Sequence, residues 1–394
     1  MDITQLLTFG VEQGASDCHL SAGEPPMLRI HGELKKLDHP LLTREEVHDM
    51  IFDMMNDAQR KVFQEHHECD FSFEMGEIAR FRVNVYLQRR GDGAVFRTIP
   101  TKILALEQLG MPPILRQLCD KEKGLVLVTG PTGSGKSTTL AAMIDHRNST
   151  SPGHIITVED PVEFVHRHKK SVITQREVGF DTMSFQAALK NTLRQAPDVI
   201  LIGEIRDTET MEAGIAFAET GHLCLGTLHA NNSNQAIERI MNFFPSERHA
   251  QIYLQLSMNL RAIISQRLVP GVDGKRVAAL EILMDTPRVK DLIKKGQVDQ
   301  LKDAMEQGVQ EGCQTFDYVL FTLYRDGKIS LEQALINADS ANNLRLKIKL
   351  AGLKTDDGPA DAPAAAAKTE KDKGSAFQIK GTEGPAAGTP TRRL

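Results

Sequence analysis

The sequence predicts an α/β protein whose largest part is a mostly parallel sheet covered by helices on both faces. One observation is the stretch 125–139, where a short apolar strand runs directly into a glycine-rich turn and then a helix. The other is the pattern after residue 124, in which apolar runs of strand length alternate with amphipathic runs of helical period. This alternation is typical of parallel sheets, because a parallel connection has to cross the sheet.

We expect the strands of this sheet at 125–129, 154–158, 199–203, 223–227 and 278–284. We expect its helices near 137–147, 184–195, 208–219 and 233–242. A long amphipathic segment, 247–268, follows. The pattern over 287–350 is helical, with Gly327 as a plausible helix stop. These patterns predict a core domain over 124–286 and a C-terminal helical region over 287–350.

Residues 1–100 are predicted to form a smaller α+β domain. A helix is expected over 3–12 and helical structure over 40–65, where Thr43 and Glu46 have the spacing of a capping box. Strands are expected at 27–30, 70–74, 79–88 and 93–98, and the last two form a hairpin. A proline-punctuated linker, 101–123, is expected to contain a short helix near 106–109 and another that runs through residue 118.

The C-terminal stretch 351–394 is rich in Ala, Gly, Pro and Lys and has almost no large apolar side chains. Such a segment cannot bury enough apolar surface to order itself, so we expect a disordered tail. The tail is either a solvated end or a segment that docks on a partner, and the sequence leaves both open.

Composition argues against several classes of function. The net charge of −5 and the absence of Trp give no support to nucleic-acid binding or to attraction by an anionic membrane. The five cysteines are scattered without a C-x-x-C pair, so neither a zinc ribbon nor a disulfide framework is indicated. No apolar run is close to the length needed to span a bilayer, which is about 20 residues. The N-terminus lacks the basic region of a signal peptide. We expect a cytoplasmic protein without direct membrane insertion.

The glycine-rich turn carries the clearest chemical signal. Residues 130–137 read G-P-T-G-S-G-K-S, which satisfies G-x-x-x-x-G-K-[ST] at every fixed position. Gly130, Gly133 and Gly135 allow turns that a Cβ would block, so that successive N–H groups, including that of Ser134, can point at phosphate oxygens. Lys136 and Ser137 would then contact the β- and γ-phosphates and Mg²⁺. A turn that binds nothing is the alternative, but the order strand, loop, helix favours a nucleoside triphosphate.

Acidic residues follow two further predicted strands. The segment 155–163 ends in the carboxylates of Glu159, Asp160 and Glu163, which can polarise a water molecule or bind water on Mg²⁺. An acidic loop with its charges in solvent is the alternative. The strand 199–203 is followed by Glu204, as in the second strand of a P-loop site, where a carboxylate supports the metal.

Two histidines, His222 and His229, bracket the predicted strand 223–227. A histidine in such a place is more often a satisfied core residue than a catalytic one. Because side chains alternate along a strand, these two should lie at opposite ends and on opposite faces, so they cannot chelate a metal together. Sensing of phosphate or of the neighbouring strand is the functional interpretation.

Four motifs together resemble one family. The stretches GPTGSGKSTT, ITVEDPVEF, LRQAPDVILIGEIRD and TGHLCLGTLH occur in the order found in secretion-superfamily ATPases. The N-terminal ASDCHLSAGEPPMLRIHGEL and the hairpin RFRVNVYLQRRGDGAVFRTIP narrow the resemblance to the type IV pilus retraction ATPases, the PilT and PilU branches. The resemblance covers residues 1 to about 350.

The resemblance implies a hexamer whose subunits have a PAS-like N-terminal domain and a RecA-like P-loop ATPase core. It implies ATP and Mg²⁺ as ligands and an inner-membrane pilus platform protein as partner, with peripheral attachment through that partner. It assigns phosphate and magnesium contacts to Lys136, Ser137 and Thr138, activation of the attacking water to Glu163, and support of the metal to Glu204. It also assigns His222 and His229 to a histidine box near the γ-phosphate, and charge stabilisation to Arg82 and Arg97.

Two departures refine the expectation. The sequence lacks the tetracysteine insertion and the additional N-terminal domain of the extension and type II secretion relatives, which favours retraction. The PilT branch has a helix reading AIRNLIRE, where this chain reads PRVKDLIK at 287–294. The chain therefore looks more like PilU, and a PilT-type ATPase becomes a possible partner.

Three functions remain to be distinguished. The leading hypothesis is an ATP-hydrolysing motor for pilus retraction and twitching motility, autonomous or accessory to a PilT-type motor. A nucleotide-gated adaptor subunit without autonomous activity is the alternative. The departure at 287–294 favours it, whereas the complete acidic segment 155–163 argues against it. A nucleic-acid translocase is the third, and the acidic net charge argues against it.

Overall fold

The computed structural model describes residues 2–30, 32–76, 78–99 and 102–353, and they form two compact units. The first unit extends to residue 99, and the second begins at Lys102. Leu106, Leu115 and Leu118, from the segment predicted as a linker, are buried in the core of the second unit. Most of the predicted tail, from residue 354 on, lies outside the described residues.

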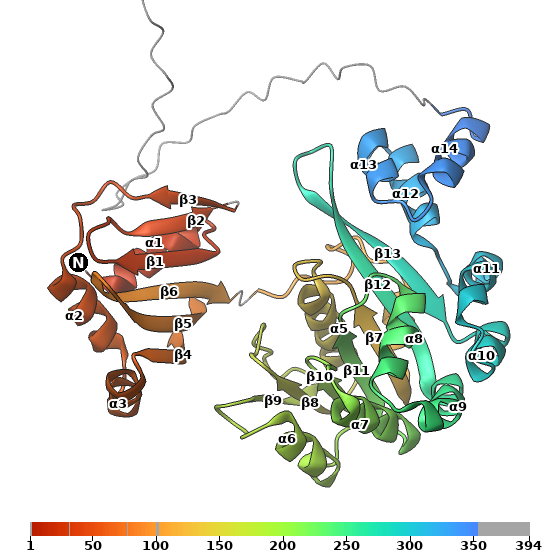
Figure 1. Ribbon diagram of the computed structural model, residues 1–394, viewed down its shortest axis with the longest axis horizontal. Coiled ribbons are helices and arrows are strands. Elements are labelled where there is room, and N and C mark those ends of the chain that lie inside the picture. Colours follow the sequence, from red (N-terminus) through yellow and green to blue (C-terminus); the bar gives the residue numbers. More distant parts are fainter. Residues whose placement is uncertain (1, 31, 77, 100–101, 354–394) are drawn as a thin grey trace, which may run out of the picture. The chain divides into compact units, whose positions relative to one another are not determined.

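The first unit contains a six-stranded antiparallel sheet in the order β3-β2-β1-β6-β5-β4 (Figure 1). Its strands are β1 (Asp17–Ser21), β2 (Met27–Ile30), β3 (Glu33–Lys36), β4 (Glu68–Met75), β5 (Ala79–Gln88) and β6 (Gly91–Ile99). Along β5, buried and half-buried residues alternate, because one face packs on the core and the other is more exposed. The β5–β6 hairpin is as predicted, whereas the strands β1 and β3 were not expected.

Three helices complete the first unit: α1 (Ile3–Glu12), α2 (Arg44–Met54) and α3 (Asp57–His66). The predicted capping box is confirmed at the start of α2, where the Thr43 side chain accepts from Glu46 N and Glu46 caps the Thr43 N–H. A second capping box, formed by Asn56 and Gln59, begins α3. The helical stretch expected over 40–65 is therefore two helices.

The second unit is built on a seven-stranded sheet in the order β13-β12-β7-β11-β10-β8-β9. All neighbouring strands run parallel except β13, which is antiparallel to β12. The strands are β7 (Gly124–Thr129), β8 (Gly153–Glu159), β9 (Ser171–Glu177), β10 (Val199–Ile202), β11 (Leu223–Leu228), β12 (Leu260–Pro270) and β13 (Arg276–Met284). Every residue of β7, β10 and β11 is buried, as expected of central strands covered on both faces. The predicted mostly parallel α/β sheet is confirmed.

Helices flank this sheet (Figure 1). They are α4 (Ile114–Cys119), α5 (Lys136–Thr150), α6 (Phe185–Thr192), α7 (Thr208–Glu219), α8 (Ser233–Asn242) and α9 (His249–Asn259). The expected long segment 247–268 is α9 followed by the strand β12, and 106–109 forms turns instead of a helix. The parallel edge strand β9 was not expected.

The C-terminal helical region is confirmed as α10 (Pro287–Lys294), α11 (Leu301–Gln307), α12 (Phe316–Arg325), α13 (Leu331–Ile336) and α14 (Ala341–Leu350). The last three helices share a small core of their own with residues of the β12–β13 hairpin. Gly327, at φ +68, follows the end of α12, and its N–H donates to Tyr324 O, so the predicted helix stop is confirmed. None of the helices in the described ranges is long and apolar enough to cross a membrane.

Candidate nucleotide site

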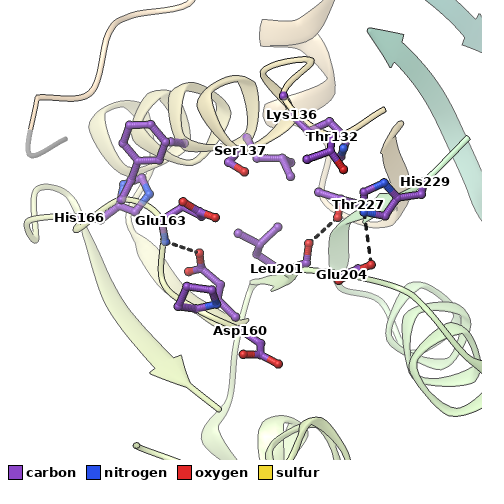
Figure 2. Close-up of a pocket in the computed structure, with 17 residues that line it drawn as sticks. Thr132, Lys136, Ser137, Asp160, Glu163, His166, Leu201, Glu204, Thr227 and His229 are labelled. Carbon is purple, nitrogen blue, oxygen red and sulfur yellow. Dashed lines mark hydrogen bonds and ion pairs between the residues drawn. The ribbon is translucent and has the colours of Figure 1, made fainter. Parts of the chain in front are cut away.

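The candidate site is a cavity of about 280 Å³ at the carboxyl ends of the parallel strands. Its walls come from the glycine-rich loop and the first turns of α5, from the segment after β8, and from the ends of β10 and β11 (Figure 2). Six of the predicted site residues line it: Gly133, Lys136, Ser137, Glu163, Glu204 and His229. Ligands of open α/β sheets bind at this edge.

The glycine-rich loop has the backbone that its sequence predicts. Gly130, Gly133 and Gly135 all have positive φ, at +148, +77 and +89. A Cβ on Gly130 would lie 2.5 Å from both Gln266 O and Ser134 Oγ, so only glycine fits there. Helix α5 begins directly after Gly135, which has no side chain to cap it. The N–H groups of its first turn and the positive end of its dipole therefore face the loop.

Lys136 is held by the loop itself, because its Nζ donates to Gly130 O at 2.9 Å and to Pro131 O at 3.0 Å. Burial lowers the pKa of Lys136, while the carboxylate of Glu204 works against that shift. Ser137 and Thr138 follow in the first turn of α5. The Ser134 hydroxyl is buried and finds no hydrogen-bond partner within the described part of the chain.

Strand β12 supports the loop through contacts that sequence reasoning missed. The Thr139 hydroxyl donates to Gln266 Oε1 at 2.7 Å, and the Thr129 hydroxyl donates to the Ser265 hydroxyl at 2.9 Å. All four of these side chains are almost fully buried. They tie both ends of the glycine-rich loop to the neighbouring strand, so the loop is held before any ligand binds.

The three carboxylates after β8 have different surroundings. Glu159 is 8% exposed; its Oε1 accepts from the Thr157 hydroxyl at 2.6 Å and its Oε2 from Glu163 N at 3.4 Å. Burial raises the pKa of Glu159, and these hydrogen bonds oppose the shift. Asp160 lies 3.9 Å from Arg206 as an exposed ion pair. The interpretation of the segment as a purely solvated acidic loop is wrong, because Glu159 is buried and anchors the backbone of Glu163.

Glu204 and His229 form the opposite side of the cavity. His229 Nε2 lies 3.3 Å from Glu204 Oε1, and Thr227, which also lines the cavity, donates its hydroxyl to Gly203 O. Burial and the nearby Lys136 cation lower the pKa of His229, against the attraction of Glu204. A neutral imidazole beside a carboxylate can donate a hydrogen bond to it and accept one from another group.

The structure does not bring His222 to this cavity. It precedes β11, at the amino end of the strand, and its Nδ1 lies 3.2 Å from Phe217 O and 3.0 Å from the Thr220 hydroxyl. The separation of the two histidines to opposite ends of the strand is as predicted. The expectation that His222 acts beside the nucleotide is not met within this unit, because the cavity lies at the other end of β11.

Arg82 and Arg97 lie in the first unit, directly opposite each other on β5 and β6. Arg97 Nε donates to Asp17 Oδ1 at 3.1 Å, and its side chain is 68% exposed. Arg29 also pairs with Asp17, at 3.5 Å. One buried carboxylate, that of Asp17, thus partly neutralises the positive charge that Arg29 and Arg97 bring to this sheet. A contact of these arginines with a nucleotide stays a prediction.

The loop, the helix N-terminus and the carboxylates at the strand ends define a P-loop nucleotide-binding protein. Residues 1–334 match the family model described as type II/IV secretion system protein. The chain belongs to this family.

Individual relatives support this family assignment. The type IV pilus ATPase PilU of Pseudomonas aeruginosa is 52% identical over 351 residues, 89% of this chain and 92% of that protein. The type IV pilus retraction ATPase PilT of the same organism is 50% identical over 343 residues, 87% of this chain and 100% of that protein. The crystal structure of the pilus retraction motor PilT with bound ADP superposes with a TM-score of 0.81 at 44% identity, covering 86% of this chain and 98% of that one. The resemblance stated from the motifs is confirmed.

Proposed function

We propose that this protein is an ATP-hydrolysing motor subunit of a type IV pilus machinery and that it powers retraction. The supporting observation is the single cavity that gathers Lys136, Ser137, Glu163, Glu204 and His229 at the end of a parallel sheet. Its relatives named as pilus ATPases cover nearly the whole described chain, which supports the same activity.

The residues have separable roles in this proposal. The N–H groups of the glycine-rich loop and Lys136 bind the phosphates, and the dipole of α5 adds to their attraction. Glu163 accepts a proton from the attacking water, and its backbone is fixed by the hydrogen bond to Glu159. Lys136 offsets charge that develops on the γ-phosphate, because it is held at the loop in advance.

The residues present also fit Mg²⁺. The ion prefers oxygen ligands and usually binds proteins through one or two side chains plus phosphates and water. The Ser137 hydroxyl and the Glu204 carboxylate both line the cavity and offer such oxygens. When bound, the ion would neutralise phosphate charge. His229 holds the Glu204 carboxylate from the other side.

The assembly and partners complete the proposal. We infer a homo-hexamer that is peripheral to the inner membrane through the pilus platform protein, with no nucleic acid involved. Arg82 and Arg97 would contribute charge at a subunit interface. Identities of 52% to PilU and 50% to PilT do not separate the two branches. The sequence of helix α10, at 287–294, departs from the PilT branch and supports a PilU-like role that depends on a PilT-type motor. A non-hydrolysing adaptor is the alternative.

Two variants test the site. Lys136→Ala should weaken ATP binding at least tenfold, because the loop loses its cation. Glu163→Gln should keep ATP binding and lose about a hundredfold or more in phosphate release, because the amide cannot accept the proton. The matched controls are Lys123→Ala and Glu247→Gln, both exposed and outside the cavity. Wild-type phosphate release by Glu163→Gln would reject the assignment.

A further inference from the structure

His166 is a buried polar residue of the nucleotide cavity that the roles above leave unused. His166 is 9% exposed and lines the cavity together with Leu140 and Ala141 of α5. Its Nδ1 is buried and has no hydrogen-bond partner within the described part of the chain. A buried polar atom without a partner is rare and costly, so a residue that served only to fill this space would be better replaced by an apolar one.

The segment that carries His166 is fixed in place by Gln175 of β9. Gln175 Oε1 accepts from His166 N at 2.7 Å, and Gln175 Nε2 donates to Phe164 O at 2.8 Å. At the other end of the segment, Glu163 N donates to Glu159 at 3.4 Å. The backbone from Glu163 to His166 is therefore held at both ends, which sets where the imidazole ring lies.

His166 lies on the same side of the cavity as Glu163. Figure 2 shows both residues on the side of the cavity opposite Glu204 and His229. Burial lowers the pKa of His166 to about 4, with Asp145 opposing the shift and Lys169 adding to it. The ring is therefore neutral near pH 7 and has one nitrogen that donates and one that accepts. The cavity, at about 280 Å³, is large enough for several water molecules of roughly 30 Å³ each.

We propose that His166 is a positioning residue for hydrolysis: its imidazole ring, at the wall of the cavity, holds a water molecule that orients the carboxylate of Glu163 toward the attacking water. This inference rests on the proposed role of Glu163. His166 acts through that carboxylate and does not contact the nucleotide. It therefore affects the rate of the chemical step and leaves nucleotide binding unchanged.

The test compares two substitutions in the full chain. His166→Asn keeps an amide near the place of Nδ1, and His166→Leu has similar volume without any polar atom. Steady-state phosphate release should fall about 10- to 100-fold in kcat for His166→Leu, because a displaced catalytic group loses rates of this size. His166→Asn should stay within about threefold of the wild type. KM and the Kd of a slowly hydrolysed ATP analogue should change less than about twofold in both.

A double variant shows whether the effect passes through Glu163. In the Glu163→Gln background, adding His166→Leu should leave the residual rate unchanged, because the carboxylate that His166 orients is already gone. A further loss equal to that in the wild type would overturn the inference. So would full kcat in His166→Leu, or a KM that rises as far as kcat falls. If Glu163→Gln itself hydrolyses ATP normally, the proposed function fails first, and the two failures are thereby distinguished.

Discussion

His166 also makes the stability of the second unit depend on pH, in a way that one substitution removes. Its pKa is lowered from 6.5 to about 4 by burial, so the unfolded chain binds a proton between these pH values that the folded chain does not. The contribution of His166 to stability is therefore fully present above about pH 6.5 and is lost as the pH falls toward 4. His166→Leu has no such group and no such loss.

The size of the effect follows from the two pKa values. One unit of pKa corresponds to about 1.4 kcal/mol, so the full loss is about 3.4 kcal/mol. Between about pH 7 and about pH 5, roughly 2 kcal/mol of this is lost. Urea unfolding of both proteins at the two pH values measures it, with far-ultraviolet circular dichroism as the signal because the chain has no Trp. If the wild type and His166→Leu lose equal stability over this range, the described burial of the imidazole is wrong.

Two further predictions concern the walls of the cavity. Glu159→Leu should destabilise the protein by about 2–4 kcal/mol in urea unfolding, because it leaves the buried Thr157 hydroxyl without its acceptor. Adding Thr157→Val should recover about half of the lost stability, and no recovery would contradict this reason. Gly130→Ala should weaken ATP binding at least tenfold in calorimetry, because its Cβ would lie 2.5 Å from Gln266 O. Gly221→Ala is the matched control, with φ at +98 but nothing within 4 Å, and an equal loss of binding there would refute the steric explanation.

The glycine-rich loop could be predicted from sequence because its geometry is local. Gly130, Gly133 and Gly135 require positive φ whatever surrounds them, and the strand before and the helix after are short-range patterns. The parallel sheet was predictable for the same reason, since each central strand is an uninterrupted apolar run.

The supports of the loop were not predictable, because they depend on contacts between distant residues. Thr139 and Gln266 are separated by 127 positions, and the segment that contains Gln266 has apolar residues that suit a helix or a strand. The segment forms the strand β12 because it pairs with β7 on one side and β13 on the other, and this pairing cannot be seen in the sequence. The edge strand β9 was missed because buried and exposed side chains do not alternate regularly along it, so it lacks the period of a half-buried strand.

The distribution of roles among the acidic and histidine side chains shows a similar limit. The sequence predicted Glu159, Asp160 and Glu163 at one sheet edge, but which carboxyl is buried depends on contacts with distant residues such as Gln175, whose Nε2 donates to Glu159 Oε1 at 3.4 Å. The family resemblance assigned His222 to the site, whereas the strand pattern predicted that His222 and His229 lie at opposite ends of the strand. The structure confirms that they lie at opposite ends of β11. His166 was not anticipated, since a histidine in an irregular segment gives no periodic signal.

The most direct measurement is steady-state phosphate release by the purified wild-type chain with ATP and Mg²⁺, in the absence of any other motor ATPase. We expect turnover that is lost in Glu163→Gln, while both proteins bind ATP with similar affinity. Tight ATP binding by the wild type with no release above that of Glu163→Gln would contradict the proposed motor function. The cavity would then belong to a nucleotide-gated adaptor, and the motor activity would have to reside in another subunit.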